Sequence, residues 1–312
     1  MRTGAARGFV GHFHEAGFYA SDAEFLQLMV PFVEEGLAAG EPVVIGYDER
    51  KSDLLRSRLS APSAVESITG PGLYATPARA IATYRRLFEF YMTLGAEQIR
   101  VAGELPHPGN GGQYEGWDRY ESAVNKVWQD FPVWGRCLYD TTTTPATVLD
   151  VVERTHPRLI TPAGHRRVSE RFQEPAEFDR LPAPPEPLEA GPPLTELIDC
   201  TPAEARRALI RIGRGRVADK TLKDLTHGIS EAVTNAVCHG TPPVTTRIWA
   251  TWHRVVVSVH DRGPGPTDPL AGLVPATPDA MLPGWGLWLI HQLDIDTTLI
   301  RSGDGFTVRL RG

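Results

Sequence analysis

Apolar residues recur along the first half of the chain with two different spacings. They return every three or four residues, as on one face of a helix, over residues 21–40, 79–95, 114–131 and 144–157. Short continuous apolar runs, typical of buried strands, lie at residues 14–19, 41–48, 98–105 and 133–140. Because these strands alternate with helices, the pattern predicts an α/β domain with a mainly parallel, helix-covered sheet.

The second half of the chain has a different order of elements. A long helical pattern over about residues 219–239 precedes two strand patterns at 244–250 and 253–261. After a loop rich in glycine and proline come a short apolar helix at 286–293 and a hairpin at 296–310 that turns at SGDG. Neighbouring strands joined by tight turns predict an antiparallel or mixed sheet with helices on one face, an α+β domain.

A proline-rich stretch separates the two patterns. Seven prolines lie between Pro175 and Pro193, and proline both lacks a backbone donor and pushes the preceding residue out of helical conformation. We therefore predict one domain at residues 1–172, a linker at 173–194 and a second domain at 195–312. The alternative is that this stretch is a loop packed across both domains.

Composition narrows the class of protein. The 312 residues suit two domains, and 41% apolar with 22% charged residues is ordinary for a globular protein. A net charge of −6 argues against a direct nucleic-acid or anionic-membrane binder. Three scattered cysteines without a CxxC pair, no apolar run of about 18 residues and no signal-peptide core lead us to expect a cytoplasmic protein.

The long helix of the second half carries a polar column. Glu231, Asn235 and His239 are four residues apart and therefore stack on one helix face. Gly240 follows, and we expect it to end the helix in the left-handed conformation. The opposite face is an apolar stripe directed at the sheet, made of Leu222, Leu225, Ile229, Val233 and Ala236.

Two glycine-containing stretches accompany this helix. Asp261 ends a predicted strand, and a carboxylate there can accept from an exocyclic amine such as adenine N6; Gly263 and Gly265 follow and permit close backbone approach to a ligand. Gly284 and Gly286 precede a short helix whose N-terminal N–H groups could face a phosphate. Each stretch alone could equally be an ordinary turn.

In order, these motifs are ExxxN on a helix, DxGxG after a strand and GxGL before a helix. They resemble the Bergerat-fold (GHKL, HATPase) ATPases over about residues 195–312, and SEAVTNAVCHG and GWGLWLI are most similar to the anti-sigma-factor serine kinases. The resemblance implies ATP and Mg²⁺ as cofactors. It implies that Asn235 holds Mg²⁺, that Asp261 binds adenine and that Glu231 is the general base. The residues implied to shape the nucleotide and phosphate site are Gly263, Gly265, Gly284, Gly286 and Leu287.

The chain lacks basic residues at two places in the predicted nucleotide site. The predicted lid over the nucleotide, residues 267–283, contains no Lys or Arg. Trp285 also stands where many relatives carry a basic residue. This departure leaves open whether the chain transfers phosphate or only binds nucleotide.

The first domain has no Gly-Lys pair and hence no Walker A loop. Over about residues 8–160 it resembles the MEDS domain, a methanogen and methylotroph sensory domain, which implies a RecA-like α/β fold. The stretches that carry this resemblance are residues 12–46, 117–127 and 137–157. The pair His12 and His14 suggests a metal, but no third ligand is evident nearby. Polar or aromatic groups near strand ends, where such sheets bind small molecules, are His12, His14, Tyr19, Glu104, Trp117, Glu121 and Tyr139.

Together the two resemblances imply a bacterial regulatory protein in transcription and stress response. The sensory domain would control an ATP-binding anti-sigma factor of the serine/threonine kinase type, whose partners are a sigma factor and an anti-sigma-factor antagonist. A homodimer is also implied. One alternative is a sensor histidine kinase, which needs a phosphoacceptor histidine on a dimerising helix where this chain is proline-rich. The other is a catalytically weak ATP-binding partner-switch module.

Overall fold

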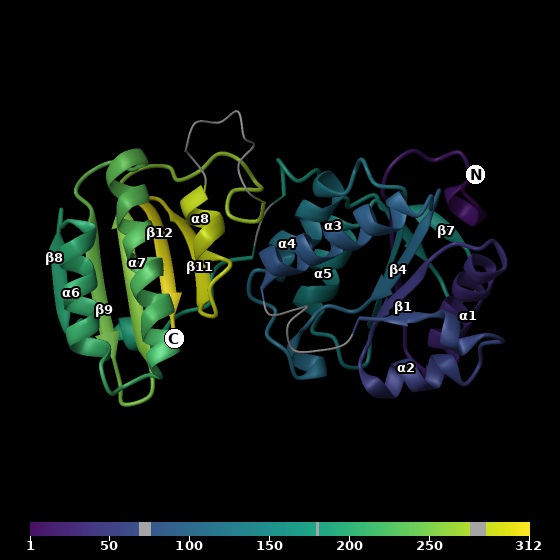
Figure 1. The fold of residues 1–312 in the computed structure, drawn as a ribbon, viewed down its shortest axis with the longest axis horizontal. Helices are drawn as coiled ribbons and strands as arrows, with labels where there is room; N and C mark the ends of the chain where they lie inside the picture. The colour runs from purple at the N-terminus through teal and green to yellow at the C-terminus, as the bar shows by residue number, and fades with distance from the viewer. Residues whose placement is uncertain (69–75, 179–180, 275–284) are drawn as a thin grey trace. The chain divides into compact units, whose positions relative to one another are not determined.

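The computed structural model describes residues 1–68, 76–178, 181–274 and 285–312 (Figure 1). The chain divides into two compact units. One comprises Met1–Ala75 with Ala80–Arg180, and the other Thr76–Arg79 with Leu181–Gly312. Each unit has its own hydrophobic core and its own sheet, so the two are described separately.

The first unit is built on a seven-stranded sheet in the order β3-β2-β4-β5-β1-β6-β7. All neighbouring strands pair in parallel except β7, which runs antiparallel to β6. The mainly parallel sheet predicted from the sequence is therefore confirmed. Its strands are β1 (Phe13–Tyr19), β2 (Val43–Gly46), β3 (Glu66–Ser67), β4 (Ile99–Gly103), β5 (Val133–Asp140), β6 (Arg158–Ile160) and β7 (Arg166–Val168).

Helices cover both faces of this sheet. After β1 the chain crosses towards β2 in one direction and later returns through β4 and β5 in the other, so right-handed crossovers place the later helices on the opposite face. Figure 1 accordingly shows α1 and α2 on one side and α3, α4 and α5 on the other. The helices are α1 (Asp22–Ala38), α2 (Glu49–Arg56), α3 (Pro77–Thr93), α4 (Trp117–Val127) and α5 (Ala146–Thr155).

A buried ion pair lies on the α1 face of the central strands. Glu15 of β1 is fully buried, and its Oε1 accepts from Arg136 Nε and from Trp134 Nε1, both at 2.8 Å. Its Oε2 accepts from Arg166 Nε at 2.9 Å. Both carboxylate oxygens are thus satisfied inside the core, as a buried charge requires.

The second unit has a five-stranded sheet in the order β11-β12-β10-β9-β8, and every pairing is antiparallel. Three helices cover one face through the core that contains Leu225, Ile229 and Val257. The predicted α+β arrangement is confirmed, and α7 has the predicted bounds. The elements are β8 (Thr195–Ile198), α6 (Pro202–Gly213), α7 (Asp219–His239), β9 (Thr245–Ala250), β10 (Val255–Asp261), α8 (Trp285–Ile290), β11 (Asp296–Ser302) and β12 (Gly305–Arg311).

Residues 184–194, which we call the proline strap, bind to the sheet of the second unit. Glu186 is buried, and its Oε2 accepts from Arg254 Nη2 at 2.8 Å. Glu189 accepts two hydrogen bonds from Arg309 of β12, at 3.0 and 2.6 Å. Arg309 alternates along β12 with core residues, so it emerges on the sheet face opposite the helices. The strap therefore covers part of that second face.

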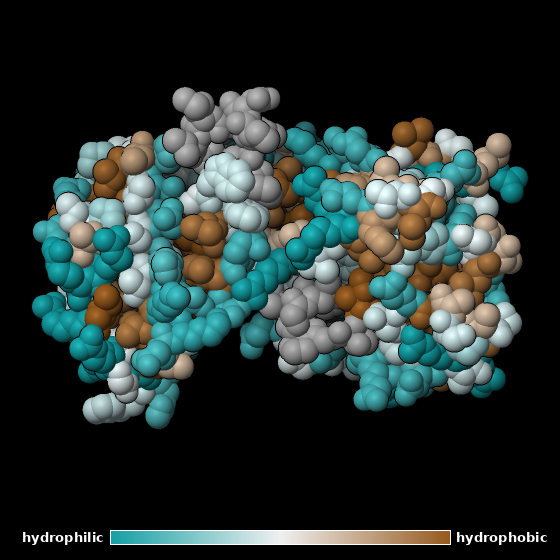
Figure 2. All heavy atoms as spheres, viewed as in Figure 1, coloured by the Kyte–Doolittle hydropathy of each residue, from teal (hydrophilic) through white to brown (hydrophobic). Residues whose placement is uncertain are grey.

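Among the described residues, no helix is long and apolar enough to cross a membrane. In Figure 2, hydrophilic residues cover much of the visible face, and hydrophobic residues appear between them in small groups.

Candidate functional site

Helix α7 presents its two faces as the sequence predicts. Leu225, Ile229 and Val233 have no exposed surface and pack in the core of the second unit. Glu231 and Asn235 are half-buried, and His239 is exposed at the last residue of the helix. The apolar stripe thus fixes the rotation of α7, and that rotation directs the polar column away from the core.

Glu231 and Asn235 converge on the first turn of α8. A Cβ added to Gly286 would lie 2.8 Å from both amide atoms of Asn235 and 3.1 Å from Glu231 Oε2. Only a glycine lets the α8 backbone approach the two side chains this closely. The structure therefore brings together three of the residues singled out in the sequence.

The Asn235 amide has an unsatisfied buried atom. Its Nδ2 is buried and has no hydrogen-bond partner among the described residues. Because the oxygen and nitrogen of an amide are assigned only from their partners, the same position suits Oδ1 after a flip. An amide oxygen that lacks a protein donor is a ligand of the kind Mg²⁺ prefers. The residue present at this position thus fits the cation implied by the sequence motif.

Asp261 lies at the end of β10 beside the C-terminus of α7. It is buried, and its Oδ1 accepts from the backbone N–H of Gly263 at 2.7 Å and of Thr241 at 3.1 Å. Its Oδ2 accepts no hydrogen bond within the described ranges. One oxygen therefore fixes the side chain while the other is left as an acceptor, as binding of an exocyclic amine requires.

The expected left-handed conformation of Gly240 is wrong. Its φ of −83° and ψ of −171° are extended values that other residues can adopt. The need for glycine comes instead from contact, because a Cβ at this position would lie 2.4 Å from Cγ of Asp261 and 2.5 Å from the Ala236 carbonyl oxygen. Gly240 thus makes room for the carboxylate, and the sequence did not reveal this role or that of Thr241.

The loop after Asp261 passes closely over the sheet. Gly265 has a φ of +69°, in the left-handed region, and a Cβ there would lie 2.4 Å from the ring of Phe306 in β12. A glycine is needed at this position for both reasons. Gly263 and Gly265 therefore shape the chain next to Asp261, while their predicted approach to a ligand stays a prediction.

The remaining sequence candidates near α8 have different placements. Leu287 is buried in the core of the second unit. Trp285 is 43% exposed and packs edge-on against Trp288, with ring centroids 5.5 Å apart. Gly284 and residues 275–283 of the predicted lid lie outside the described residues.

All candidates of the first unit except Trp117 fall into two groups. Tyr19 and Glu104 lie near Lys51, whose amine pairs with Glu104 and sits 5.5 Å from the Tyr19 ring centroid. Glu104 Oε1 is also 3.2 Å from Nε2 of His107. Glu104 lines a groove of about 700 Å³ that also touches Gly46 at the carboxyl end of β2. A groove at this edge of a parallel sheet is where such folds bind small molecules.

The second group lies beneath α4 and α5, on the face of the sheet opposite α1. The Tyr139 hydroxyl donates to Glu121 Oε1, and His14 and His12 stack with ring centroids 4.6 Å apart. Two residues that sequence reasoning missed, Cys137 and His156, complete this group. Trp117 packs elsewhere, edge-on against Tyr120 at 5.2 Å between centroids.

Comparison with protein families gives one match for each unit. Residues 13–157 match the family MEDS, described as the MEthanogen/methylotroph, DcmR Sensory domain. Residues 200–311 match the family described as Histidine kinase-like ATPase domain. Both resemblances expected from the motifs are confirmed, and an ATPase domain of this family implies ATP binding, commonly with Mg²⁺.

Comparisons with curated proteins and with solved structures do not refine this assignment. No curated protein matches the chain. Among solved structures, the Acinetobacter baumannii histidine kinase AdeS shares 12% identity with a TM-score of 0.23, and the match covers 38% of this chain and 66% of that one. The match thus spans just under two thirds of that kinase chain, and at this TM-score the likeness is too weak to support an inference.

Proposed function

We propose that this protein, which joins a MEDS sensory domain to a histidine kinase-like ATPase domain, is an ATP-binding anti-sigma factor of the serine/threonine kinase type. The two family matches support a regulatory, ATP-binding, kinase-like protein. The finer assignment is supported by SEAVTNAVCHG and GWGLWLI, the stretches most similar to the anti-sigma-factor kinases. The ATPase domain would bind a sigma factor and release it when an antagonist competes for the same domain. The sensory domain would control which of the two partners is bound.

One observation carries the nucleotide part of this proposal. Glu231, Asn235 and Gly286 meet at the first turn of α8, and Asp261 lies beside the end of the same helix α7. Position 240, just beyond the end of α7, is five residues after position 235, and at about 1.5 Å per residue this amounts to about 8 Å along the helix axis. A cation ligand and an adenine acceptor at that spacing suit the two ends of one bound nucleotide.

The side chains have distinct tasks in this arrangement. Asp261 Oδ2 would accept from the adenine amine, while Asn235 would hold Mg²⁺, which neutralises phosphate charge when bound. Glu231, one turn before Asn235, would take the proton of a serine or threonine hydroxyl on the antagonist as that oxygen bonds to the γ-phosphorus and ADP leaves. The geometry supports Glu231 in this role because its Oε2 faces the same glycine as Asn235.

The test is the variant Asn235→Ala, with Mg-ATP affinity measured by calorimetry. We expect affinity to fall at least about 100-fold, because the cation loses its protein ligand, a change of about 2.7 kcal/mol. Thr234→Ala is the matched control, since the Thr234 side chain is exposed on the adjacent position of α7. Equal affinities for wild type and Asn235→Ala would refute the role of Asn235.

A second candidate function is an ATP-binding switch module without phosphoryl transfer. It is favoured by Trp285, an exposed uncharged side chain at the first residue of α8. Incubating the protein with γ-labelled ATP and a co-purified partner separates the two functions. Acid-stable label on the partner supports the serine/threonine kinase, and acid-labile label indicates a histidine kinase. An ATP-dependent rise in melting temperature without any label on either protein indicates a binding module.

A further inference from the structure

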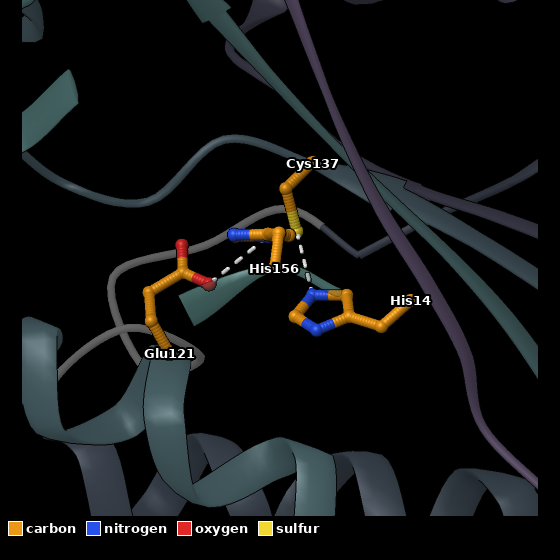
Figure 3. A group of neighbouring side chains, drawn as sticks. All are labelled: His14, Glu121, Cys137 and His156. Atoms are coloured by element: carbon orange, nitrogen blue, oxygen red, sulfur yellow. Dashed lines mark hydrogen bonds and ion pairs between the residues drawn. The ribbon is translucent and has the colours of Figure 1, made fainter. Parts of the chain in front are cut away.

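Four potential metal ligands converge inside the sensory domain (Figure 3). They are His14 of β1, Cys137 of the neighbouring strand β5, Glu121 of α4 and His156, the residue that follows α5. One ligand atom from each residue lies within 4.8 Å of all the others. The two histidines and Glu121 are at most 2% exposed.

The His14 ring is oriented by a fixed partner. Its Nδ1 lies 2.9 Å from Oδ1 of Asn125. The Asn125 Nδ2 donates to three backbone carbonyls, among them that of Thr155 at 2.7 Å, so the amide orientation is determined and Oδ1 must accept. His14 therefore carries its proton on Nδ1 and directs the lone pair of Nε2 at Cys137 Sγ, 3.6 Å away.

His156 is oriented in the same manner. Its Nδ1 donates to the Val152 carbonyl oxygen at 2.8 Å, which leaves the lone pair on Nε2. That nitrogen lies 3.3 Å from Glu121 Oε2, yet the geometry is not that of a hydrogen bond, and both atoms are buried without a partner among the described residues. Two acceptors that face each other in a core need a shared positive partner, which is a proton or a cation.

The separations suit a tetrahedral ion. With bonds of about 2.0 Å to nitrogen or oxygen and about 2.3 Å to sulfur, the edges of a tetrahedron are about 3.3 Å between nitrogen and oxygen and about 3.5 Å between nitrogen and sulfur. The two edges observed here are 3.3 Å and 3.6 Å. A cavity of about 30 Å³ is lined in part by three of the four residues, His14, Glu121 and Cys137.

The pKa shifts of the four side chains are compatible with metal binding. Burial lowers the pKa of His14 to about 4 and that of His156 well below its ordinary value, so both rings are neutral. Burial also raises the pKa of Glu121 to about 8 and that of Cys137 well above its ordinary value. The two neutral imidazoles keep the lone pairs that a metal ion requires.

We propose that His14, Glu121, Cys137 and His156 form a binding site for a divalent transition-metal ion, best suited to Zn²⁺, inside the sensory domain. Two imidazoles, a thiolate and a carboxylate match the preferences of Zn²⁺ and disfavour Mg²⁺ and Ca²⁺, which take oxygen ligands. Cysteine and glutamate bind a metal ion in their deprotonated forms, so one thiolate and one carboxylate balance the two positive charges of the ion.

Four protein ligands leave no open position, so the site is structural or regulatory and not catalytic. The ion would bind α4 and the residue after α5 to the two central strands. Its occupancy would thereby influence the packing of two helices on the sheet. This site is independent of the nucleotide site, so failure of either proposal leaves the other intact.

The first experiment is metal titration of the full-length, chelator-treated protein with Zn²⁺ and with Co²⁺. We expect one ion per chain and, with Co²⁺, a thiolate-to-metal charge-transfer band. Cys137→Ser should abolish the band and weaken binding at least about 100-fold. The matched control is Cys200→Ser, a buried cysteine of the other domain, which should bind as wild type does. Absence of stoichiometric binding by wild type, or binding that persists in Cys137→Ser, overturns the proposal.

The variant Glu121→Gln separates metal binding from folding. Its amide can accept from Tyr139 and donate to His156 Nε2, as the protonated carboxyl does, so the metal-free fold should keep its melting temperature. The amide cannot lose a proton to become an anionic ligand, so Zn²⁺ affinity should fall at least about 100-fold. Calorimetric titration with Zn²⁺ measures the affinity of both proteins. Unchanged Zn²⁺ affinity in Glu121→Gln overturns the proposal.

Discussion

The side chain of Asp261 uses its two oxygens differently. Oδ1 is held by the backbone N–H groups of Thr241 and Gly263, and Gly240 leaves the space that the carboxylate occupies. The position of Oδ2 is thus determined by backbone and not by a flexible partner. Such preorganisation lowers the entropic cost of binding a nucleobase.

We predict that Asp261→Asn weakens ATP binding about 10- to 100-fold while the fold survives. The Asn oxygen can still accept from Thr241 and Gly263, whereas its NH₂ group cannot accept from the adenine amine, a loss of about 1–3 kcal/mol. Calorimetry with ATP measures the affinity, and the melting temperature without nucleotide is the control. Unaltered ATP affinity would remove Asp261 from the nucleotide site.

Sequence spacing identified residues whose partners are close along the chain. Glu231 and Asn235 share a helix face by periodicity alone, and Asp261 stands at the end of a clear strand. The role of Gly240 was not predictable, because it depends on a contact with a strand more than 15 residues later. His14, Glu121, Cys137 and His156 were not grouped either, since no spacing signals a set spread over four elements. Polar residues within buried strands, such as His14 and Cys137, were the sequence feature that could have indicated this cluster.

At the scale of elements, the contact between α7 and α8 depends on one missing side chain. The residue is Gly286, where a Cβ would come within 2.8 Å of the Asn235 amide. Since α8 begins at Trp285, Gly286 belongs to its first turn. The approach of the two helices and the position of the amide are therefore coupled.

We predict that Gly286→Ala impairs Mg-ATP binding more than it impairs folding. Alanine favours a helix by up to about 1 kcal/mol over glycine, which offsets part of the steric cost, but its methyl group must displace Asn235. The matched control is Gly303→Ala, because a Cβ at Gly303 meets nothing within 4 Å. Titration with ATP and thermal unfolding measure the two effects, and a Gly286→Ala protein that binds ATP as tightly as Gly303→Ala would contradict the prediction.

Two elements of the second unit, α6 and β8, were not predicted from the sequence, for different reasons. Helix α6 follows the proline-rich stretch, yet it has a detectable start signal, a capping box in which Thr201 and Glu204 bond each other's backbone N–H. Strand β8 has only four residues with alternating exposure at a sheet edge, so only its pairing with β9 defines it. Long periodic elements such as α1 and α7 were predicted within a few residues because burial enforces their period.

For the molecule as a whole, the buried charge of Glu15 links stability to pH. Burial by itself would raise the pKa of Glu15, but the positive charges of Arg136 and Arg166 outweigh it and lower the pKa. A carboxylate with a lowered folded-state pKa adds stability above its unfolded pKa of about 4.3, and that stability is lost as the pH falls through the folded pKa.

We predict that Glu15→Gln destabilises the first unit by about 3 kcal/mol at pH 7 and reduces its loss of stability in acid. The variant leaves Arg136 buried without its counter-charge, which is costly. Glu153→Gln is the control, because it breaks a half-exposed pair with Arg171 and should cost less than about 1 kcal/mol. Urea unfolding of the full chain from pH 7 down to about pH 2, which spans the range below the unfolded pKa, measures both effects, with β1 followed by hydrogen exchange. Equal effects of the two variants would contradict the prediction.

The proline strap has a practical consequence for any truncation. A fragment that contains only the residues of the family match, 200–311, would lack the strap. Arg254 and Arg309 would then lose their acidic partners Glu186 and Glu189. Trp249 donates from Nε1 to the Gly191 carbonyl oxygen at 2.9 Å, so its side chain would become exposed to solvent on the same face. Such a fragment would carry a cationic, aromatic surface foreign to the intact chain and would be prone to adhere to acidic proteins. Pull-down assays for a partner should therefore start the fragment before Pro184.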